Sequence, residues 1–151
     1  MLGLQEIIGN EKQASELDPD KLAQEQDLLD RANKVRTAWN KPMTVTSGVR
    51  TWEHHLDIYR AKAANHQKPF LDGVFDESKV PKQSKHLETV TDCAAVDIAD
   101  PGLEITKWLK ENPSILEDAG LYCENGNQNW VHFQNKPFGS YKPGGTRWFN
   151  P

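Results

Sequence analysis

Three residues in the second half of the chain have side chains that could bind a metal ion: His86, Asp97 and His132. His132 lies in the segment WVHFQ, which predicts a strand in which Trp130, His132 and Gln134 share one face. Asp97 lies in the apolar run AAVDI, where an unpaired carboxylate would be costly. Imidazole and carboxylate groups suit a hydrolytic zinc site, which has about three protein ligands and an open position for water. Each residue alone also fits an ordinary role, so the case for a metal site depends on their combination.

The segments TSGVRTWEHHLDIYR, SKHL, AAVDIAD and WVHFQ, in this order, resemble the zinc D-Ala-D-Ala peptidase family over roughly residues 20–149. That family includes phage endolysins that cleave L-Ala-D-Glu or D-Ala-containing peptides, and it shares its fold with the hedgehog signalling domain. The resemblance implies a zinc peptidase that acts on the peptidoglycan stem peptide, with zinc held by His86, Asp97 and His132. Phage-encoded members are the most similar in size.

The resemblance also assigns substrate-binding residues. SGVR is similar to the family's SGYR, which implies that Arg50 faces the cleft and holds a substrate carbonyl or carboxylate, or stabilises the oxyanion. Ser84 stands two residues before His86, as in the family's SxH pattern, and is expected near the site. Trp130 is a candidate wall of the cleft, and Arg147 a candidate second anchor.

The spacing of the first two ligands departs from the family's HxxGxAxD pattern. Ten residues separate His86 from Asp97, where the family has six, and Cys93 stands at the usual glycine. We interpret this as a four-residue insertion that leaves Asp97 in register as the ligand. The alternative alignment keeps the six-residue gap and makes Cys93 the ligand, which is chemically possible because thiolate binds zinc.

The general base is the second departure. Many family members carry an acid three residues before the last histidine, but that position here is Asn129, whose amide cannot accept a proton. Glu124 is the nearest upstream carboxylate and is our candidate base; Glu88 and Asp92 are weaker candidates. The rival hypothesis is a catalytically inactive, zinc-stabilised binding or virion structural module of the same fold. The third hypothesis is a metal-free domain whose histidines have structural roles.

Regular elements must bring these residues together. The predicted elements are helix 18–39, strand 43–47, helix 52–64, a long loop 65–85, strand 94–98, helix 103–110 and strands 121–124 and 130–134. Asp18 and Thr51 are the expected N-caps of the first two helices. This order predicts one α+β domain over residues 1–151, with a small antiparallel sheet flanked by helices, as in the hedgehog/DD-peptidase fold.

Composition limits the partners. The net charge of −4 argues against nucleic acid, and no apolar run approaches the roughly 20 residues that span a membrane. Cys93 and Cys123 are expected to be buried thiols. The N-terminus has no basic segment before an apolar stretch, so we expect synthesis in the cytoplasm without a signal peptide. We also expect the protein to be a monomer. The resemblance then implies action on the cell wall after release, in phage lysis or from a virion.

Overall fold

Helix α2 (Pro19–Trp39) is the longest element, and it confirms the first predicted helix in the computed structural model, which describes residues 1–151. Leu28, Ala32 and Val35 recur at helical spacing and are completely buried, so this stripe forms the centre of the core. The Asp18 carboxylate accepts a hydrogen bond from the backbone N–H of Asp20 at 2.8 Å and caps the first turn. Asn40 takes the left-handed conformation and ends the helix.

A five-stranded sheet packs on this helix. Its strands are β1 (Val45–Ser47), β2 (Ala95–Ala99), β3 (Tyr122–Glu124), β4 (Trp130–Gln134) and β5 (Trp148–Phe149), in the order β1-β2-β4-β3-β5. The pairs β1/β2, β2/β4 and β3/β4 are antiparallel, whereas β3 and β5 are parallel. The α+β class is therefore confirmed, with a sheet that is mixed because of its last strand.

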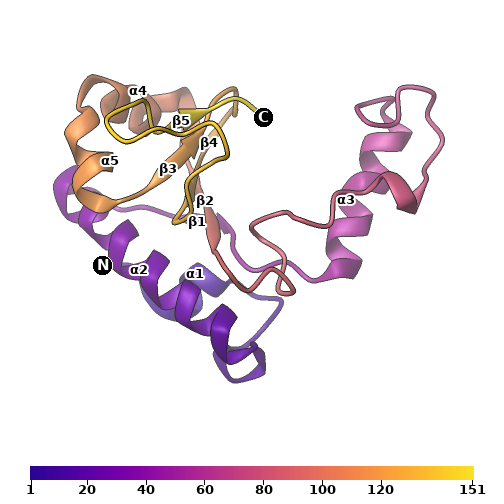
Figure 1. Ribbon diagram of the computed structural model, residues 1–151, viewed down its shortest axis with the longest axis horizontal. Coiled ribbons are helices and arrows are strands. Elements are labelled where there is room, and N and C mark those ends of the chain that lie inside the picture. Colours follow the sequence, from indigo (N-terminus) through magenta and orange to yellow (C-terminus); the bar gives the residue numbers. More distant parts are fainter.

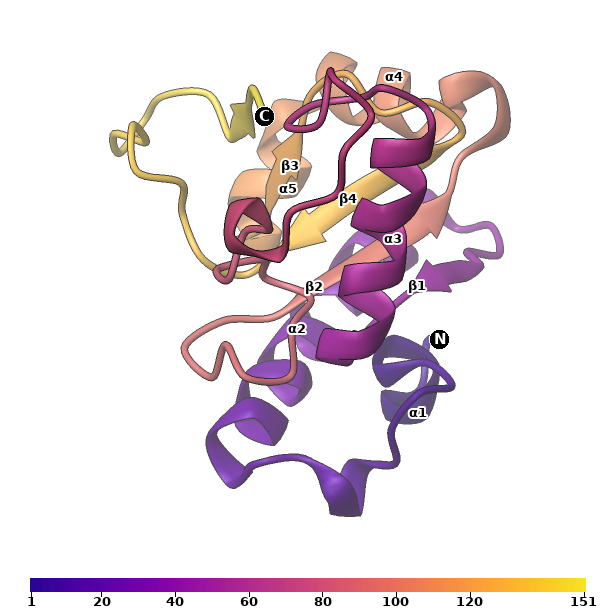
Figure 2. The same ribbon diagram turned by 90° about the vertical axis from the view of Figure 1, so that its right-hand side faces the viewer.

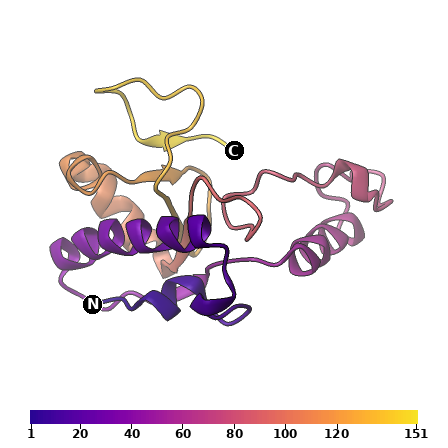
Figure 3. The same cartoon turned by 60° about the horizontal axis from the view of Figure 1, so that its bottom comes forward.

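The two faces of the sheet have different surroundings. Val96 and Ile98 of β2 and Val131 and Phe133 of β4 point into the core, where helices α1 (Leu4–Ile8), α2, α4 (Glu104–Glu111) and α5 (Pro113–Ala119) cover them. In Figure 3, α1 and α2 lie on one side of the sheet and the segment that leads to β5 lies on the other. The alternate residues of β2 and β4 therefore face away from the helices, and they include Asp97 and His132.

A second lobe projects from this body in Figures 1 and 3, and in Figure 2 it faces the viewer. It consists of helix α3 (Trp52–Ala64), which the Thr51 side chain caps, and of the segment that returns beside it to residue 81. Its own small core contains Leu56, Ala63, Phe70 and Val80. Most of the predicted long loop 65–85 is thus the second half of this lobe, and it contains one 3₁₀ turn, Glu77–Lys79.

Two short helices were not predicted. Helix α1 has five residues and α5 has seven, which is too short for an apolar period to be visible in the sequence. The helix predicted at 103–110 starts at Glu104, after a 3₁₀ turn at Pro101–Leu103. No helix has both the length and the apolar composition that a membrane crossing needs.

Helix α2 also buries an ion pair. Glu25 is fully buried, and its carboxylate lies 3.6 Å from the Lys21 ammonium without accepting a hydrogen bond from any group. Burial raises the pKa of Glu25 to about 7, although the charge of Lys21 opposes this. The folded protein therefore keeps a proton on Glu25 at pH values where the unfolded chain has lost it.

This proton makes stability depend on pH. Because the folded-state pKa is raised from 4.5 to about 7, the contribution of Glu25 is fully present below about pH 4.5 and is lost as the pH rises through 7. In the metal-free protein we expect the unfolding free energy of the wild type to fall relative to Glu25→Gln over this range. The expected loss is on the order of 3 kcal/mol. Urea unfolding of both proteins at several pH values measures it, and a pH-independent difference would contradict an elevated pKa.

Candidate metal centre

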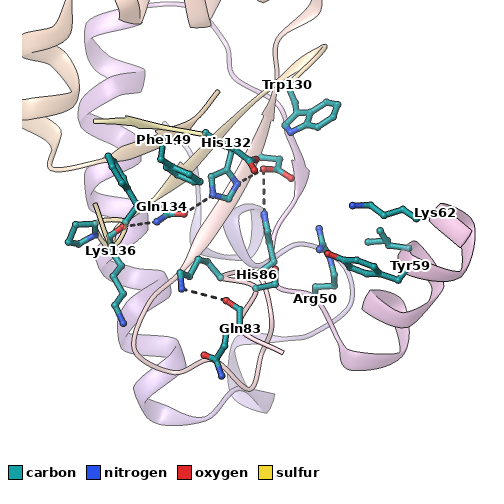
Figure 4. A pocket seen from close by; sticks show the side chains of 18 residues that line it. Arg50, Tyr59, Lys62, Gln83, His86, Trp130, His132, Gln134, Lys136 and Phe149 are labelled. Carbon is teal, nitrogen blue, oxygen red and sulfur yellow. Dashed lines mark hydrogen bonds and ion pairs between the residues drawn. The ribbon is translucent and has the colours of Figure 1, made fainter. Parts of the chain in front are cut away.

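The register of β2 and β4 places Asp97 directly opposite His132. His132 Nδ1 lies 2.9 Å from Asp97 Oδ1, and His86 Nε2 lies 3.4 Å from the same oxygen. One ligand atom from each of the three residues lies within 4.8 Å of the others (Figure 4). The structure therefore brings the predicted ligands into one cluster that has the spacing of a metal site.

The chain around Gly48 determines which ring nitrogen of His86 carries the proton and which is free to bind a metal. His86 Nδ1 lies 2.9 Å from the Gly48 carbonyl oxygen, and because a carbonyl can only accept, Nδ1 carries the proton. Nε2 then has its lone pair directed at the cluster, as in a metal-binding histidine. A Cβ on Gly48 would lie 2.1 Å from the Ile7 carbonyl oxygen. Only glycine lets this segment pass the end of α1 and present its carbonyl to His86.

Gln134 determines which ring nitrogen of His132 carries the outer proton and which one faces the cluster. The Gln134 amide N–H donates to the Lys136 carbonyl at 2.7 Å, which leaves its side-chain oxygen, 3.1 Å from His132 Nε2, as an acceptor. Nε2 therefore carries a proton, and Nδ1 faces Asp97. Both histidines have an outer hydrogen-bond partner and turn their other nitrogen inward, which is the usual arrangement around a protein-bound zinc ion.

The protonation states of Asp97, His132 and His86 depend on one another. Burial alone would raise the pKa of Asp97, but its interactions with His132 and His86 outweigh it and hold that pKa well below its usual range. Burial also opposes protonation of His132, yet its bond to Asp97 raises its pKa. For His86, burial dominates and lowers the pKa. A metal cation can replace the proton between His132 and Asp97, so the donor set could hold a metal ion.

The cluster lies at the base of a cleft of about 660 Å³ between the sheet and the α3 lobe. Arg50, Glu124, Trp130 and Ser84, all predicted at the site, line this cleft together with the three ligands. Trp130 is 38% exposed and stands at its edge. The ligands are thus reachable by a molecule bound in the cleft.

Arg50 has no acidic partner. One of its terminal nitrogens lies 3.4 Å from His55 Nδ1, the other lies 3.5 Å from Ser47 Oγ, and the buried Nε has no hydrogen-bond partner. His55 is itself fixed by the Pro81 carbonyl at 2.8 Å. Burial lowers the pKa of Arg50, although Asp97 raises it. A guanidinium with so few partners can bind an anionic or carbonyl oxygen in the cleft.

Among the acids considered as general base, only Glu124 lines the cleft. It ends β3, beside the strand that carries His132, and has no hydrogen-bond or ion-pair partner. Glu88 pairs with Lys12 at 3.4 Å and Asp92 pairs with Lys136, and neither of these two acids lines the cleft. Asn129 lies in a turn with a positive φ and does not line the cleft.

Cys93 and Arg147 lie elsewhere. Cys93 is buried with Leu87 and Val90 and is absent from the ligand cluster, which favours Asp97 as the ligand. Both cysteines are free and buried, as predicted. Arg147 stacks on Tyr122 and donates to the Leu121 carbonyl, so its guanidinium stabilises the C-terminal segment and does not line the cleft.

Tyr59 and Lys62 of α3 also line the cleft, and sequence reasoning missed them. Burial raises the pKa of the Tyr59 hydroxyl, although the charge of Arg50 opposes this. The helical spacing of three from Tyr59 to Lys62 was the available signal, because it puts both on one face.

Comparisons with protein-family models, with curated proteins and with solved structures found no match to this chain.

The two candidate ligands can be separated by substitution. Asp97→Asn is expected to weaken zinc binding by more than the 10- to 100-fold that loss of an outer hydrogen-bond partner costs, because it removes a ligand. Cys93→Ala is the matched control and is expected to stay within about threefold of the wild type, since losing a thiol outside the ligand set leaves the metal contacts intact. Competition with a chromophoric chelator measures both affinities. Strong loss in Cys93→Ala with retention in Asp97→Asn would contradict this ligand set.

Proposed function

We propose that this protein is a zinc-dependent peptidase that hydrolyses peptide bonds of bacterial peptidoglycan, in the D-Ala-D-Ala or L-Ala-D-Glu part of the stem peptide. The observation that carries the proposal is the cluster of His86, Asp97 and His132 at the base of a cleft that also presents Glu124 and Arg50. Ligands, acid and guanidinium on one accessible surface are the parts that metal-assisted hydrolysis requires.

Each residue then has a chemical task. A zinc ion, when bound, supplies Lewis acidity toward the scissile carbonyl and toward water. Glu124 accepts a proton from the attacking water and delivers it to the leaving amine. Arg50 holds a carboxylate or carbonyl oxygen of the substrate and stabilises negative charge that develops there. Trp130 and Ser84 also line the cleft and contact the substrate there.

The charge of the cleft supports an acidic peptide as substrate. Four basic side chains line it, against the two carboxylates of Asp97 and Glu124, although the whole chain has a net charge of −4. The basic side chains are those of Arg50, Lys62, Lys85 and Lys136, of which Lys136 is paired with Asp92. A cleft whose charge is opposite to that of the surrounding protein concentrates ligands of the other sign. Stem peptides carry free carboxylates and fit this field.

The sequence resemblance to zinc D-Ala-D-Ala peptidases and phage endolysins supports the same function and suggests the hedgehog/DD-peptidase fold. On this proposal the protein is made in the cytoplasm and reaches the cell wall during phage lysis or from a virion. Asn129 favours the inactive, zinc-stabilised module as the second candidate, because it replaces the acid expected before the last histidine. The place of Glu124 in the cleft supports activity.

Digestion of purified peptidoglycan tests the proposal. Wild-type protein with zinc is expected to release defined fragments, and a chelator to stop their release, with the new amino termini read by mass spectrometry. Glu124→Gln is expected to lower kcat by about 10²- to 10⁴-fold while zinc content stays the same, because only the proton acceptor is lost.

Glu88→Gln is the control, since Glu88 lies outside the cleft, and its activity is expected to match the wild type. Zinc bound at one ion per chain with no fragment released by the wild type would reject the enzyme and favour the binding module. Full activity of Glu124→Gln would reject Glu124 as the base.

A further inference from the structure

Lys21 occupies a position that is unfavourable for a cation in two ways. It is the third residue of α2, close to the positive end of the helix dipole, and it is completely buried. Burial lowers its pKa, and the nearby Glu25 counteracts this. A lysine in such a place is costly unless its ammonium makes specific contacts.

The ammonium of Lys21 makes two such contacts with one distant segment. It donates to the Cys93 carbonyl at 2.9 Å and to the Lys85 carbonyl at 3.1 Å. These partners lie 72 and 64 residues away along the chain. Glu25, 3.6 Å away, is the only acid that pairs with Lys21, and it offsets the buried charge.

The two carbonyls bracket the connection between the first two metal ligands. The Lys85 carbonyl belongs to the peptide bond that joins Lys85 to His86, and the Cys93 carbonyl lies just before the strand that carries Asp97. Between them the segment 86–93 is also held by the buried side chains of Leu87 and Val90, by two backbone hydrogen bonds with Arg50, and at its surface by the pairs Lys12–Glu88 and Lys136–Asp92. Lys21 adds a buried side chain that donates a hydrogen bond at each end of this segment.

We propose that Lys21 is a positioning residue that clamps both ends of segment 86–93 and thereby fixes His86 relative to Asp97 for metal binding. This inference rests on the proposed metal centre. The ligand distance of 3.4 Å between His86 and Asp97 spans a ten-residue connection, and an unclamped connection samples many other separations.

The test compares zinc affinity in three full-length proteins. Lys21→Met alone leaves Glu25 as an unpaired buried acid, so the informative variant is Lys21→Met with Glu25→Gln, which keeps the volume and removes both charges. We expect its zinc Kd to rise by about 10- to 100-fold. Glu25→Gln alone retains the lysine and its two hydrogen bonds, and its Kd is expected to stay within about threefold of the wild type. A double variant that binds zinc as tightly as Glu25→Gln overturns the proposal.

A second readout separates positioning from general stability and does not need the metal. In the metal-free double variant, the backbone amides of Leu87, Glu88 and Val90 are expected to exchange with solvent at least about tenfold faster than in Glu25→Gln. Leu116→Ala, a core substitution in α5, is the control that lowers stability without touching this segment. Equal exchange in the double variant and Glu25→Gln overturns the clamp. Absence of zinc binding in the wild type rejects the metal centre instead, and leaves this exchange experiment to decide on Lys21.

Discussion

The carboxylate of Asp97 is a largely buried anion, with its side chain 15% exposed, and the surrounding structure is organised around the need to neutralise it. Two imidazoles approach the same oxygen, one from the neighbouring strand and one from the segment before β2. Each imidazole is oriented by a partner of its own, Gly48 for His86 and Gln134 for His132. An unpaired carboxylate at this depth would destabilise the sheet, so the cluster is at once a structural requirement and a ready set of metal ligands.

The fold divides into parts that short-range patterns can predict and parts that they cannot. Helix α2 was predicted from its apolar spacing and its N-cap at Asp18, because these signals act within a few residues. Strands β2 and β4 were predicted from their alternation and composition. The parallel pairing of β5 with β3 and the separate lobe around α3 depend on contacts between distant segments, and no local pattern encodes those.

The candidate site shows the same division. Asp97 and His132 could be found because each is a polar residue inside an apolar strand, and His86 because it falls in a motif. The structure then brings the three together, which spacing along the chain could not establish. Lys21, His55 and Tyr59 were missed because their roles arise from tertiary contacts: a buried ammonium between two carbonyls, an imidazole beside Arg50 and a ring that lines the cleft.

The most direct test of the metal centre is a crystal structure of the zinc-loaded protein with anomalous diffraction recorded at the zinc edge. The account predicts one strong peak per chain, bonded to His86 through Nε2, to His132 through Nδ1 and to the carboxylate of Asp97, at about 2.0 to 2.2 Å. The Gly48 carbonyl and the Gln134 side chain would keep their bonds to the outer nitrogens. A peak at Cys93, or no peak between these three residues in protein that contains zinc, would contradict it.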